Sequence, residues 1–192
     1  MKKDIILAGV GGQGILSIAA TIGYAAVESG LFLKQSEVHG MSQRGGDVQS
    51  HFRLSDKDIA SDLIPQGSAD IIISVEPMEA LRYVSMLAPD GWVITNTTPF
   101  NNIPNYPNID EILAEIKKLP NAIQMNAEQI AKDLGSPRSA NIVVLGAATP
   151  FLGMELDKFE NALRTIFGRK GEKVVDVNIA ALHAGRELAD KK

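Results

Sequence analysis

The chain has 192 residues, of which 45% are hydrophobic and 22% charged, as is typical of a globular protein with one well-packed core. Its formal net charge of -4 and the scattering of its 19 basic residues argue against a nucleic-acid-binding surface. The chain contains no cysteine, which excludes disulfides, thiolate nucleophiles and cysteine-ligated iron–sulfur clusters from it.

Nothing in the sequence indicates attachment to a membrane. No apolar run reaches the roughly 18 residues that a membrane-spanning helix needs. The first residues, Met1 to Asp4, lead directly into a strand-like segment and show no signal-peptide pattern. We therefore expect a cytoplasmic protein that folds as one domain over residues 1–192 and binds neither nucleic acid nor membrane.

The segment from Asp4 to Gly14 is an apolar run that ends in four glycines within six residues, and a helix-compatible segment follows. This order predicts a strand, a tight turn and a helix. Unpaired backbone amides at the start of that helix would form an anion-binding concavity. The candidate residues are Gly9, Gly11, Gly12, Gln13 and Gly14. We expect a positive φ at Gly11.

The spacing of Gly9, Gly11 and Gly14 satisfies the pattern G-x-G-x-x-G. A dinucleotide site also needs an acidic residue about 20 residues further on, at the end of the second strand. The second apolar run, Leu31 to Leu33, ends instead in Lys34-Gln35-Ser36, and Glu37 lies beyond it. Dinucleotide binding and a glycine turn that serves only strand–helix packing therefore both remain open.

The predicted first helix, Ile15 to Val27, is apolar nearly all round. Such a helix is either buried within its own domain or covers a subunit interface. After the second apolar run, the stretch from Ser36 to Gly46 is polar and punctuated by glycine, which predicts an ordered loop at a strand end. Residues 47–54 then alternate between apolar and polar, which predicts a half-buried antiparallel strand near a sheet edge.

The glycine turn followed by Ser36-Glu37-Val38-His39-Gly40-Met41-Ser42-Gln43-Arg44-Gly45-Gly46 resembles the gamma-type subunit or domain of 2-oxoacid:ferredoxin oxidoreductases. Within that family the chain is most similar to the separate small subunit of the indolepyruvate-specific enzymes. The resemblance extends over essentially the whole chain, and the two motifs in this order are far more specific than either alone.

The rest of the chain alternates between predicted strands and helices. The predicted strands are 71–75, 92–95 and 122–125, and the predicted helices are 77–87, 109–119, 127–134, 156–167 and 172–189. Pro89 to Gly91 reads as a turn, and 99–107 as an irregular, proline-rich excursion. Residues 139–151 have strand propensity at their core, but their flanks and the family resemblance favour a buried helix. The expected fold is α/β: a Rossmann-like three-layer sandwich with a mostly parallel sheet and an antiparallel edge strand.

Few residues have side chains that suit catalysis or ligand binding. His39, His51 and His183 lack the spacing of metal ligands, so we expect no metal site. Glu37 and His39 either exchange a proton or pin a loop by hydrogen bonding. Arg44 either clamps a phosphate or carboxylate of a ligand or contacts a carboxylate of a partner protein. Asn96 to Thr98 would lie beyond the carboxyl end of a strand, where open α/β sheets bind ligands.

No G-x-S-x-G elbow, phosphate-binding P-loop or thiamine-type Gly-Asp-Gly segment is present, so we predict no catalytic residue in this chain. The resemblance implies a non-catalytic subunit of an enzyme that decarboxylates an arylpyruvate such as indolepyruvate oxidatively, forms an acyl-coenzyme A and passes electrons to ferredoxin. It also implies that thiamine diphosphate, magnesium and iron–sulfur clusters reside on a large partner subunit.

The same resemblance implies two roles for the residues of this chain. The glycine turn and Arg44 are candidates for contacting an anion such as coenzyme A. The expected partner interface comprises Glu37, His39, Gly40, Met41, Gln43, Arg44, Gly45 and Gly46. The alternative is a free-standing Rossmann-like dinucleotide-binding protein or dehydrogenase.

Overall fold

A six-stranded sheet in the order β2-β3-β1-β4-β5-β6 forms the centre of the molecule. The computed structural model describes residues 1–40, 45–101 and 103–191. The strands are β1 (Lys2–Val10), β2 (Phe32–His39), β3 (Asp47–Ser55), β4 (Ala69–Ser74), β5 (Leu87–Asn96) and β6 (Ala122–Met125). Strands β1, β4, β5 and β6 are mutually parallel, while β3 runs antiparallel to both β1 and β2.

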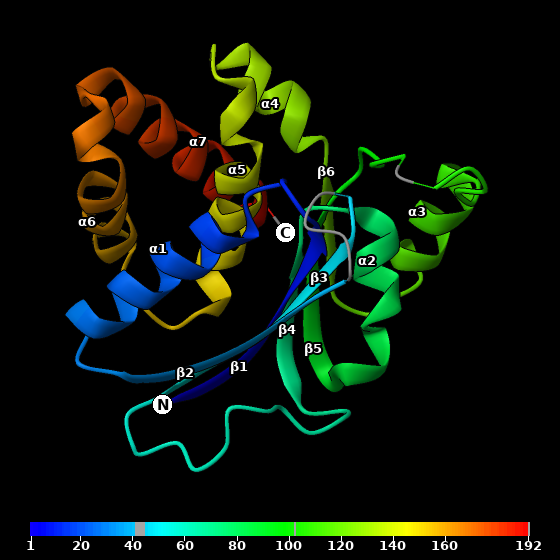
Figure 1. Ribbon diagram of the computed structural model, residues 1–192, viewed down its shortest axis with the longest axis horizontal. Coiled ribbons are helices and arrows are strands. Elements are labelled where there is room, and N and C mark those ends of the chain that lie inside the picture. The colour runs from blue at the N-terminus through cyan, green and yellow to red at the C-terminus, as the bar shows by residue number, and fades with distance from the viewer. Residues whose placement is uncertain (41–44, 102, 192) are drawn as a thin grey trace.

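Helices cover both faces of this sheet (Figure 1). One face carries α1 (Ile15–Glu28), α5 (Ala140–Ala148), α6 (Leu156–Phe167) and α7 (Glu172–Asp190). The opposite face carries α2 (Pro77–Arg82) and α3 (Ile109–Lys117), and α4 (Ala127–Asp133) directly follows β6. Short 3₁₀ turns are η1 (Val84–Met86), η2 (Pro137–Ser139), η3 (Thr149–Phe151) and η4 (Gly168–Lys170). The predicted three-layer α/β fold is confirmed.

The two hydrophobic cores follow from the alternation of side chains along the central strands. Ile5 and Leu7 of β1 belong to the core beneath α1 and α5, whereas Ile6 and Ala8 belong to the core beneath α2 and α3. Because β1 and β4 are covered on both faces, they need apolar residues at consecutive positions, which explains their unbroken apolar runs.

Helix α5 is the element whose type the sequence left open. Every residue from Asn141 to Ala148 is buried, so the helix has no polar face and its periodicity is hidden. It packs against α7 at backbone distance: a Cβ on Gly185 would lie 1.9 Å from the carbonyl oxygen of Val143, and one on Gly146 would lie 2.0 Å from that of Leu182. Only glycine fits at these two crossing points.

Several predicted boundaries were wrong. Strand β2 continues through Ser36 to His39, where we predicted a loop, because its partly exposed side chains tolerate polar residues while its backbone pairs with β3. Helix α2 ends at Arg82 rather than at 87, and β5 already begins at Leu87. The register between β4 and β5 shifts at this point, so the predicted turn at Pro89 to Gly91 is an irregular part of the strand.

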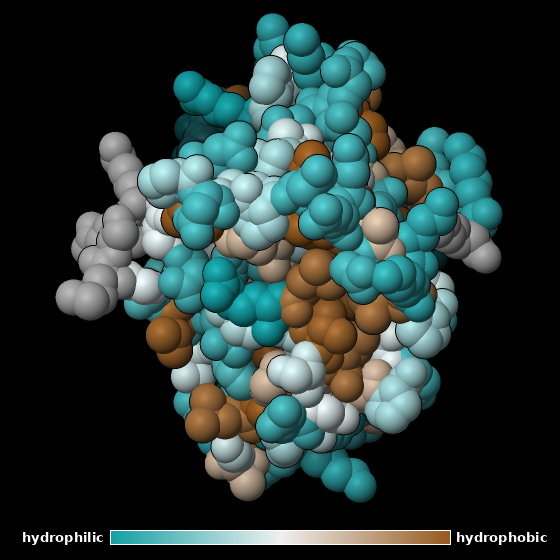
Figure 2. Space-filling model, turned by 90° about the vertical axis from the view of Figure 1, so that its right-hand side faces the viewer, coloured by the Kyte–Doolittle hydropathy of each residue, from teal (hydrophilic) through white to brown (hydrophobic). Residues whose placement is uncertain are grey.

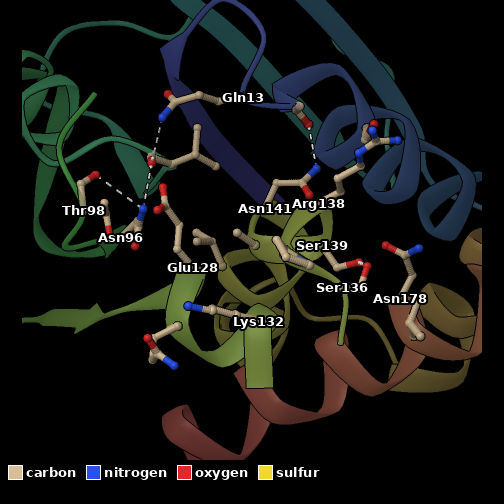
Figure 3. A pocket seen from close by; sticks show the side chains of 18 of the residues that line it. Gln13, Asn96, Thr98, Glu128, Lys132, Ser136, Arg138, Ser139, Asn141 and Asn178 are labelled. Carbon is tan, nitrogen blue, oxygen red and sulfur yellow. Dashed lines mark hydrogen bonds between the residues drawn. The ribbon is translucent and has the colours of Figure 1, made fainter. Parts of the chain in front are cut away.

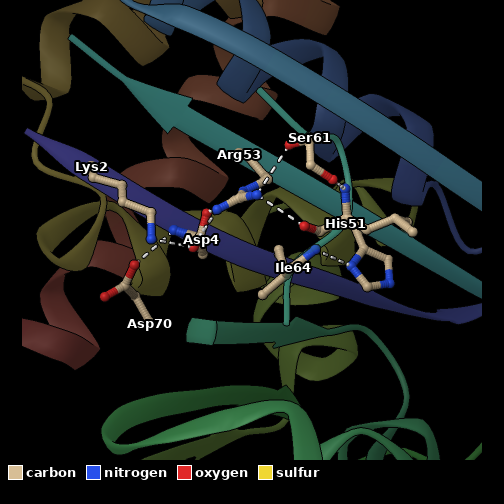
Figure 4. A network of polar contacts seen from close by, with 8 residues as sticks. Lys2, Asp4, His51, Arg53, Ser61, Ile64 and Asp70 are labelled. Carbon is tan, nitrogen blue, oxygen red and sulfur yellow. Dashed lines mark hydrogen bonds and ion pairs between the residues drawn. The ribbon is translucent and has the colours of Figure 1, made fainter. Parts of the chain in front are cut away.

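A network of buried charges ties the amino end of the sheet together (Figure 4). The carboxylate of Asp4, with no exposed surface, accepts two hydrogen bonds from Arg53, at 2.7 and 3.1 Å, and lies 2.8 Å from the ammonium group of Lys2. Arg53 also donates to the carbonyl oxygens of Ser61 and Leu63, and His51 Nδ1 accepts from the amide of Ile64. The network therefore fixes the irregular segment 56–67 to β3 and β1.

The side of the molecule that carries α3 is mostly hydrophilic, with the largest cluster of hydrophobic residues near its centre and smaller ones around it (Figure 2). Among the described residues, no helix has the length and apolar content needed to cross a membrane.

Candidate functional site

The glycine turn joins β1 to α1 at the carboxyl end of the sheet, as predicted. Gly9 lies within β1, and Gly11 to Gly14 form the turn. Positive φ angles occur at Gly12 (104°) and Gly14 (85°) and not at Gly11, so the prediction for Gly11 was wrong. Gly14 is the N-cap of α1, and a Cβ there would lie 2.6 Å from Asn141 Nδ2. Gly14, which precedes the first residue of α1, is thus in the left-handed conformation.

Side-chain amides hold this turn in shape. Gln13 Oε1 accepts a hydrogen bond from the amide of Val10 at 2.8 Å, and Asn141 Nδ2 donates to the carbonyl oxygen of Gly14 at 3.0 Å. The backbone N–H groups of Gly12, Gly14, Ile15 and Leu16 find no acceptor within the described part of the chain. These unpaired amides lie at the positive end of the α1 dipole, and anion binding there stays a prediction.

The predicted interface segment lies directly beside this turn. The amide of Gly11 donates to the carbonyl oxygen of Gly46 at 2.8 Å, and the amide of Gly45 donates to that of Gly11 at 3.3 Å. At the end of β2, His39 Nε2 lies 2.6 Å from Glu37 Oε1, and Gly40 pairs with Asp47. The predicted residues Met41, Gln43 and Arg44 lie outside the described residues. The described residues of the predicted interface therefore lie at the same end of the sheet as the glycine turn.

A cavity of about 960 Å³ opens between the glycine turn and the helices α4, α5 and α7 (Figure 3). Its walls include residues that directly follow strands, namely Val75 after β4, Asn96 and Thr98 at the end of β5, and Asn126 after β6. This is the position where open α/β sheets bind ligands. Asn96 and Thr98 were predicted from this rule.

Sequence reasoning missed the other wall of the cavity. That wall contains Lys132, Arg138, Asn141, Lys170 and Asn178. Lys132, Arg138 and Asn141 come from the successive elements α4, η2 and α5, whereas Lys170 and Asn178 come from η4 and α7 later in the chain, so no single local pattern unites all five. The one available signal was the strand-end rule applied to β6, which points to Asn126 and the start of α4.

A buried carboxylate, that of Glu76, lies at the carboxyl end of the sheet next to the cavity. Glu76 has no exposed surface, and its side chain caps α2 by accepting from the amide of Glu79. It also accepts from the amide of Phe100 at 3.2 Å and from the hydroxyl of Tyr106 at 2.5 Å. The pKa of Tyr106 is raised by burial and by this hydrogen bond. Glu76 thus anchors the proline-rich excursion 99–107, which indicates a structural role.

A second acidic group lies one turn further along α2. Burial raises the pKa of Glu79 above its ordinary value, and hydrogen bonds from Arg82 at 2.7 and 3.1 Å oppose that shift. Burial and the nearby carboxylates of Glu79 and Asp47 raise the pKa of Tyr83 to about 12. These charges are already paired with one another, so they offer no free group for acid–base catalysis.

The outer face of α1 supports the interface alternative for this helix. Its inner face is buried, but Leu16, Tyr24 and Val27 are 63%, 52% and 66% exposed. With Leu33 of β2 and Phe52 of β3, they line an apolar groove of about 390 Å³. Strand β2 borders this groove and pairs on one side only, because it ends the sheet. That α1 covers an interface stays a prediction.

The described residues alone bear on metal binding by this chain. No group of three or more His, Asp or Glu residues is close enough to hold a metal ion in the described ranges 1–40, 45–101 and 103–191, and the sequence has no cysteine. The Rossmann alternative also lacks its acidic residue: β3 separates β2 from β1, so Glu37 does not lie on the strand next to the glycine turn.

Comparison with known proteins bears on the family resemblance. Residues 4–188 match the family described as pyruvate ferredoxin/flavodoxin oxidoreductase. The indolepyruvate oxidoreductase subunit IorB of Archaeoglobus fulgidus is 39% identical, over 98% of this chain and 96% of that protein. The resemblance stated from the two motifs is confirmed.

Solved structures share the fold. The gamma subunit of a keto/oxoacid ferredoxin oxidoreductase from Geobacter sulfurreducens aligns with a TM-score of 0.72 and 25% identity, over 99% of both chains. The 2-oxoglutarate:ferredoxin oxidoreductase of Magnetococcus marinus, with 2-oxoglutarate, coenzyme A and succinyl-coenzyme A bound, aligns with a TM-score of 0.79 and 22% identity. It covers this whole chain, which spans only 31% of that longer polypeptide.

Proposed function

Because this chain belongs to the pyruvate ferredoxin/flavodoxin oxidoreductase family, we propose that it is the non-catalytic small subunit of an indolepyruvate:ferredoxin oxidoreductase. The assembled enzyme converts an arylpyruvate and coenzyme A to an acyl-coenzyme A and carbon dioxide, and ferredoxin takes the electrons. The observation that carries this proposal is the 39% identity to an indolepyruvate oxidoreductase subunit over nearly the full length of both chains.

The catalytic cofactors reside on the partner in this proposal. Thiolates are the ligands of the clusters concerned, and this chain has none. The large subunit therefore carries the iron–sulfur clusters in this proposal, together with the thiamine diphosphate and magnesium that the family resemblance implies. The small subunit forms one gamma-type domain over residues 1–192 and acts in the cytoplasm as part of the complex.

The large subunit contacts this chain at two neighbouring surfaces. One is the predicted segment Glu37 to Gly46 beside the glycine turn. The other is the apolar groove of α1 with the free edge of β2. In the Magnetococcus marinus neighbour the same fold is part of a longer chain, which supports the view that this domain works together with further domains. In a separate small subunit, a non-covalent partner must cover the equivalent apolar area.

Reconstitution tests the subunit assignment. The chain is produced alone, and also together with its large subunit, and both preparations are assayed with indolepyruvate, coenzyme A and ferredoxin. We expect turnover only from the complex. Turnover by the chain alone, or equal turnover by the large subunit without it, would refute the assignment. Val27→Asp should leave the isolated chain folded and prevent co-purification, whereas Lys117→Asp on α3, at an exposed site away from the groove, should not.

Coenzyme A contacts the glycine turn and Arg44 in this proposal. The free amides of Gly12 and Gly14 suit a pyrophosphate, and coenzyme A is bound in the Magnetococcus marinus structure. Arg44→Ala should raise the KM for coenzyme A in the assembled enzyme and leave the KM for indolepyruvate unchanged. An unchanged KM for coenzyme A in a normally assembled complex would exclude this contact.

A further inference from the structure

Strand β2 leaves one row of backbone groups unpaired at the edge of the sheet. Its eight residues pair with β3 without a register shift, and no strand of the described chain lies on its other side (Figure 1). The amide of Gly40 donates to the carbonyl oxygen of Asp47 at 2.8 Å, so these two residues form a hydrogen-bonded pair. Such pairs alternate with non-hydrogen-bonded ones along an antiparallel ladder. The residues whose N–H and C=O groups point away from β3 are therefore Leu33, Gln35, Glu37 and His39.

This free edge has little of the protection that usually prevents pairing with another chain. Edge strands are commonly interrupted by proline or a bulge, are very short, or carry charge on the edge. Strand β2 contains neither proline nor a bulge, and its one lysine, Lys34, donates to the carbonyl oxygen of Ala60. On the same face of the strand as Lys34, Phe32 and Val38 are 51% and 60% exposed. We therefore expect another polypeptide to cover this edge in the functional protein.

The apolar groove of about 390 Å³ lies directly beside the free edge. Phe52 lines it from the sheet, and the small residues Ala19, Ala20 and Gly23 line it from α1. Larger side chains of α1 surround these small ones, namely Leu16, Tyr24 and Val27. The groove therefore has room for one large side chain of a partner, which is the usual arrangement around an interface anchor.

The free edge and the groove share two residues. Leu33 and Gln35 direct their backbone groups away from β3, and both also line the groove. In an added strand, the residue directly opposite either of them lies on the same face of the sheet, with Cβ atoms about 4.5–5.5 Å apart. Its side chain would therefore enter the groove beside α1, while its neighbours in sequence would point to the face of Phe32 and Val38. One extended segment can thus satisfy both the backbone edge and the groove.

We propose that the large subunit adds an extended segment to β2 as a further strand of the sheet, and that a large apolar side chain of this segment fills the groove beside α1. In strand addition, backbone hydrogen bonds supply affinity and alternate side chains supply specificity. The large subunit is the occupant because Glu37 and His39, at the end of the free edge, also belong to the segment that we assign to its interface. The inference rests on the proposed function for the identity of the partner.

Amide hydrogen exchange in the full-length chain, alone and in complex with the large subunit, tests strand addition directly. The outward amides of Leu33, Gln35 and Glu37 should exchange rapidly in the isolated chain and about tenfold more slowly, or slower still, in the complex. The amides of Lys34 and Ser36, which bond to β3, should be protected in both states. Contact through side chains alone would not give this alternating pattern. Unchanged exchange of the outward amides in an assembled, active complex overturns the proposal.

Two pairs of variants test the edge and the groove separately. Gln35→Pro removes an outward N–H group that β3 does not use, whereas Gln35→Ala removes the same side chain and keeps that group. We expect Gln35→Pro to weaken binding of the large subunit about tenfold more than Gln35→Ala does. Ala20→Leu fills the groove from an exposed position of α1 and should weaken binding about tenfold. The matched control Ala114→Leu, at an exposed position of α3, should bind as the wild type does.

Circular dichroism of each isolated variant shows whether it is folded. If Gln35→Pro does not fold, hydrogen exchange and Ala20→Leu decide the matter. A folded Ala20→Leu variant that binds the large subunit as tightly as the wild type overturns the proposal.

The outcomes also separate this proposal from the subunit assignment. Failure of the wild-type chain to co-purify with the large subunit refutes both, whereas an active complex with unprotected outward amides refutes strand addition alone. Protection of the same amides in the isolated chain, increasing with its concentration, would show that a second copy of this chain occupies the edge, and would also overturn the proposal.

Discussion

The two ends of the sheet use their charged residues in opposite ways. At the amino end, Asp4 pairs with both Arg53 and Lys2, and Arg53 also donates to the backbone of the segment 56–67. At the carboxyl end, the backbone amides of Gly12 and Gly14 and the cations Lys132 and Arg138 have no hydrogen-bond or ion-pair partner among the described residues. Paired charges stabilise the fold at the amino end, whereas the unpaired groups at the carboxyl end are where we expect a ligand to bind.

The largest effect should come from breaking the amino-end network. Asp4→Ala leaves the guanidinium of Arg53, whose side chain is 13% exposed, without its carboxylate. We expect a loss of about 3–5 kcal/mol in the free energy of unfolding, because a buried charge would remain unpaired. Urea unfolding measures it. The control Glu115→Gln breaks the exposed pair with Lys118 and should cost less than about 1 kcal/mol. Equal losses in both variants would contradict the structural role of the network.

A smaller effect should come from the glycine turn, where geometry rather than charge is at stake. Gly14→Ala places a methyl group at a positive φ and against Asn141, so we expect a loss of about 1–3 kcal/mol in the free energy of unfolding. Gly12→Ala also has a positive φ, but nothing lies within 4 Å of the added carbon, so its loss should be smaller. The difference between the two variants, measured by thermal unfolding, isolates the contact with Asn141. The comparison fails if Gly12→Ala is the more damaging change.

The smallest effect concerns pH and the histidine of the amino-end network. Burial lowers the pKa of His51 below its ordinary value, while Asp62 opposes and Arg53 reinforces the shift. As the pH falls, His51 is therefore protonated in the unfolded chain before it is protonated in the folded one. The contribution of neutral His51 to the free energy of unfolding is complete above the unfolded pKa of about 6.5 and is lost as the pH falls below it. Unfolding curves at pH 7.5 and 5.5 should show this loss in the wild type and a smaller one in His51→Asn. An identical pH dependence would show that His51 makes no contribution.

An element of the fold could be predicted from the sequence when the pattern that specifies it lies in consecutive residues. The strand–turn–helix at Gly9 to Gly14 and the buried strand at 71–75 were predicted correctly, because glycine spacing and apolar runs are contiguous features. The type of α5 was ambiguous for the opposite reason: a helix buried on every side shows no periodicity. Strand β2 was predicted too short, since its pairing with β3 depends on tertiary contacts and not on its own composition.

The candidate site divides in the same way. The glycine turn and Asn96 to Thr98 follow from the rule that ligands bind at strand ends. Lys132, Arg138 and Asn178 come from three separate elements, and only the folded arrangement of α4, η2 and α7 places them around one cavity. The left-handed glycine was assigned to Gly11 and is found at Gly12 and Gly14, because spacing alone does not determine which residue of a turn reverses its backbone.

The glycine crossing of α5 and α7 has a consequence for the order in which the chain becomes stable during synthesis. Helix α5 has no face that tolerates water, and the surface that covers it belongs to the last helix of the chain. In a nascent chain that stops short of Gly185, the apolar side of α5 that packs against α7 is therefore exposed. This side of α5 is therefore covered only after the chain has been synthesised past Gly185.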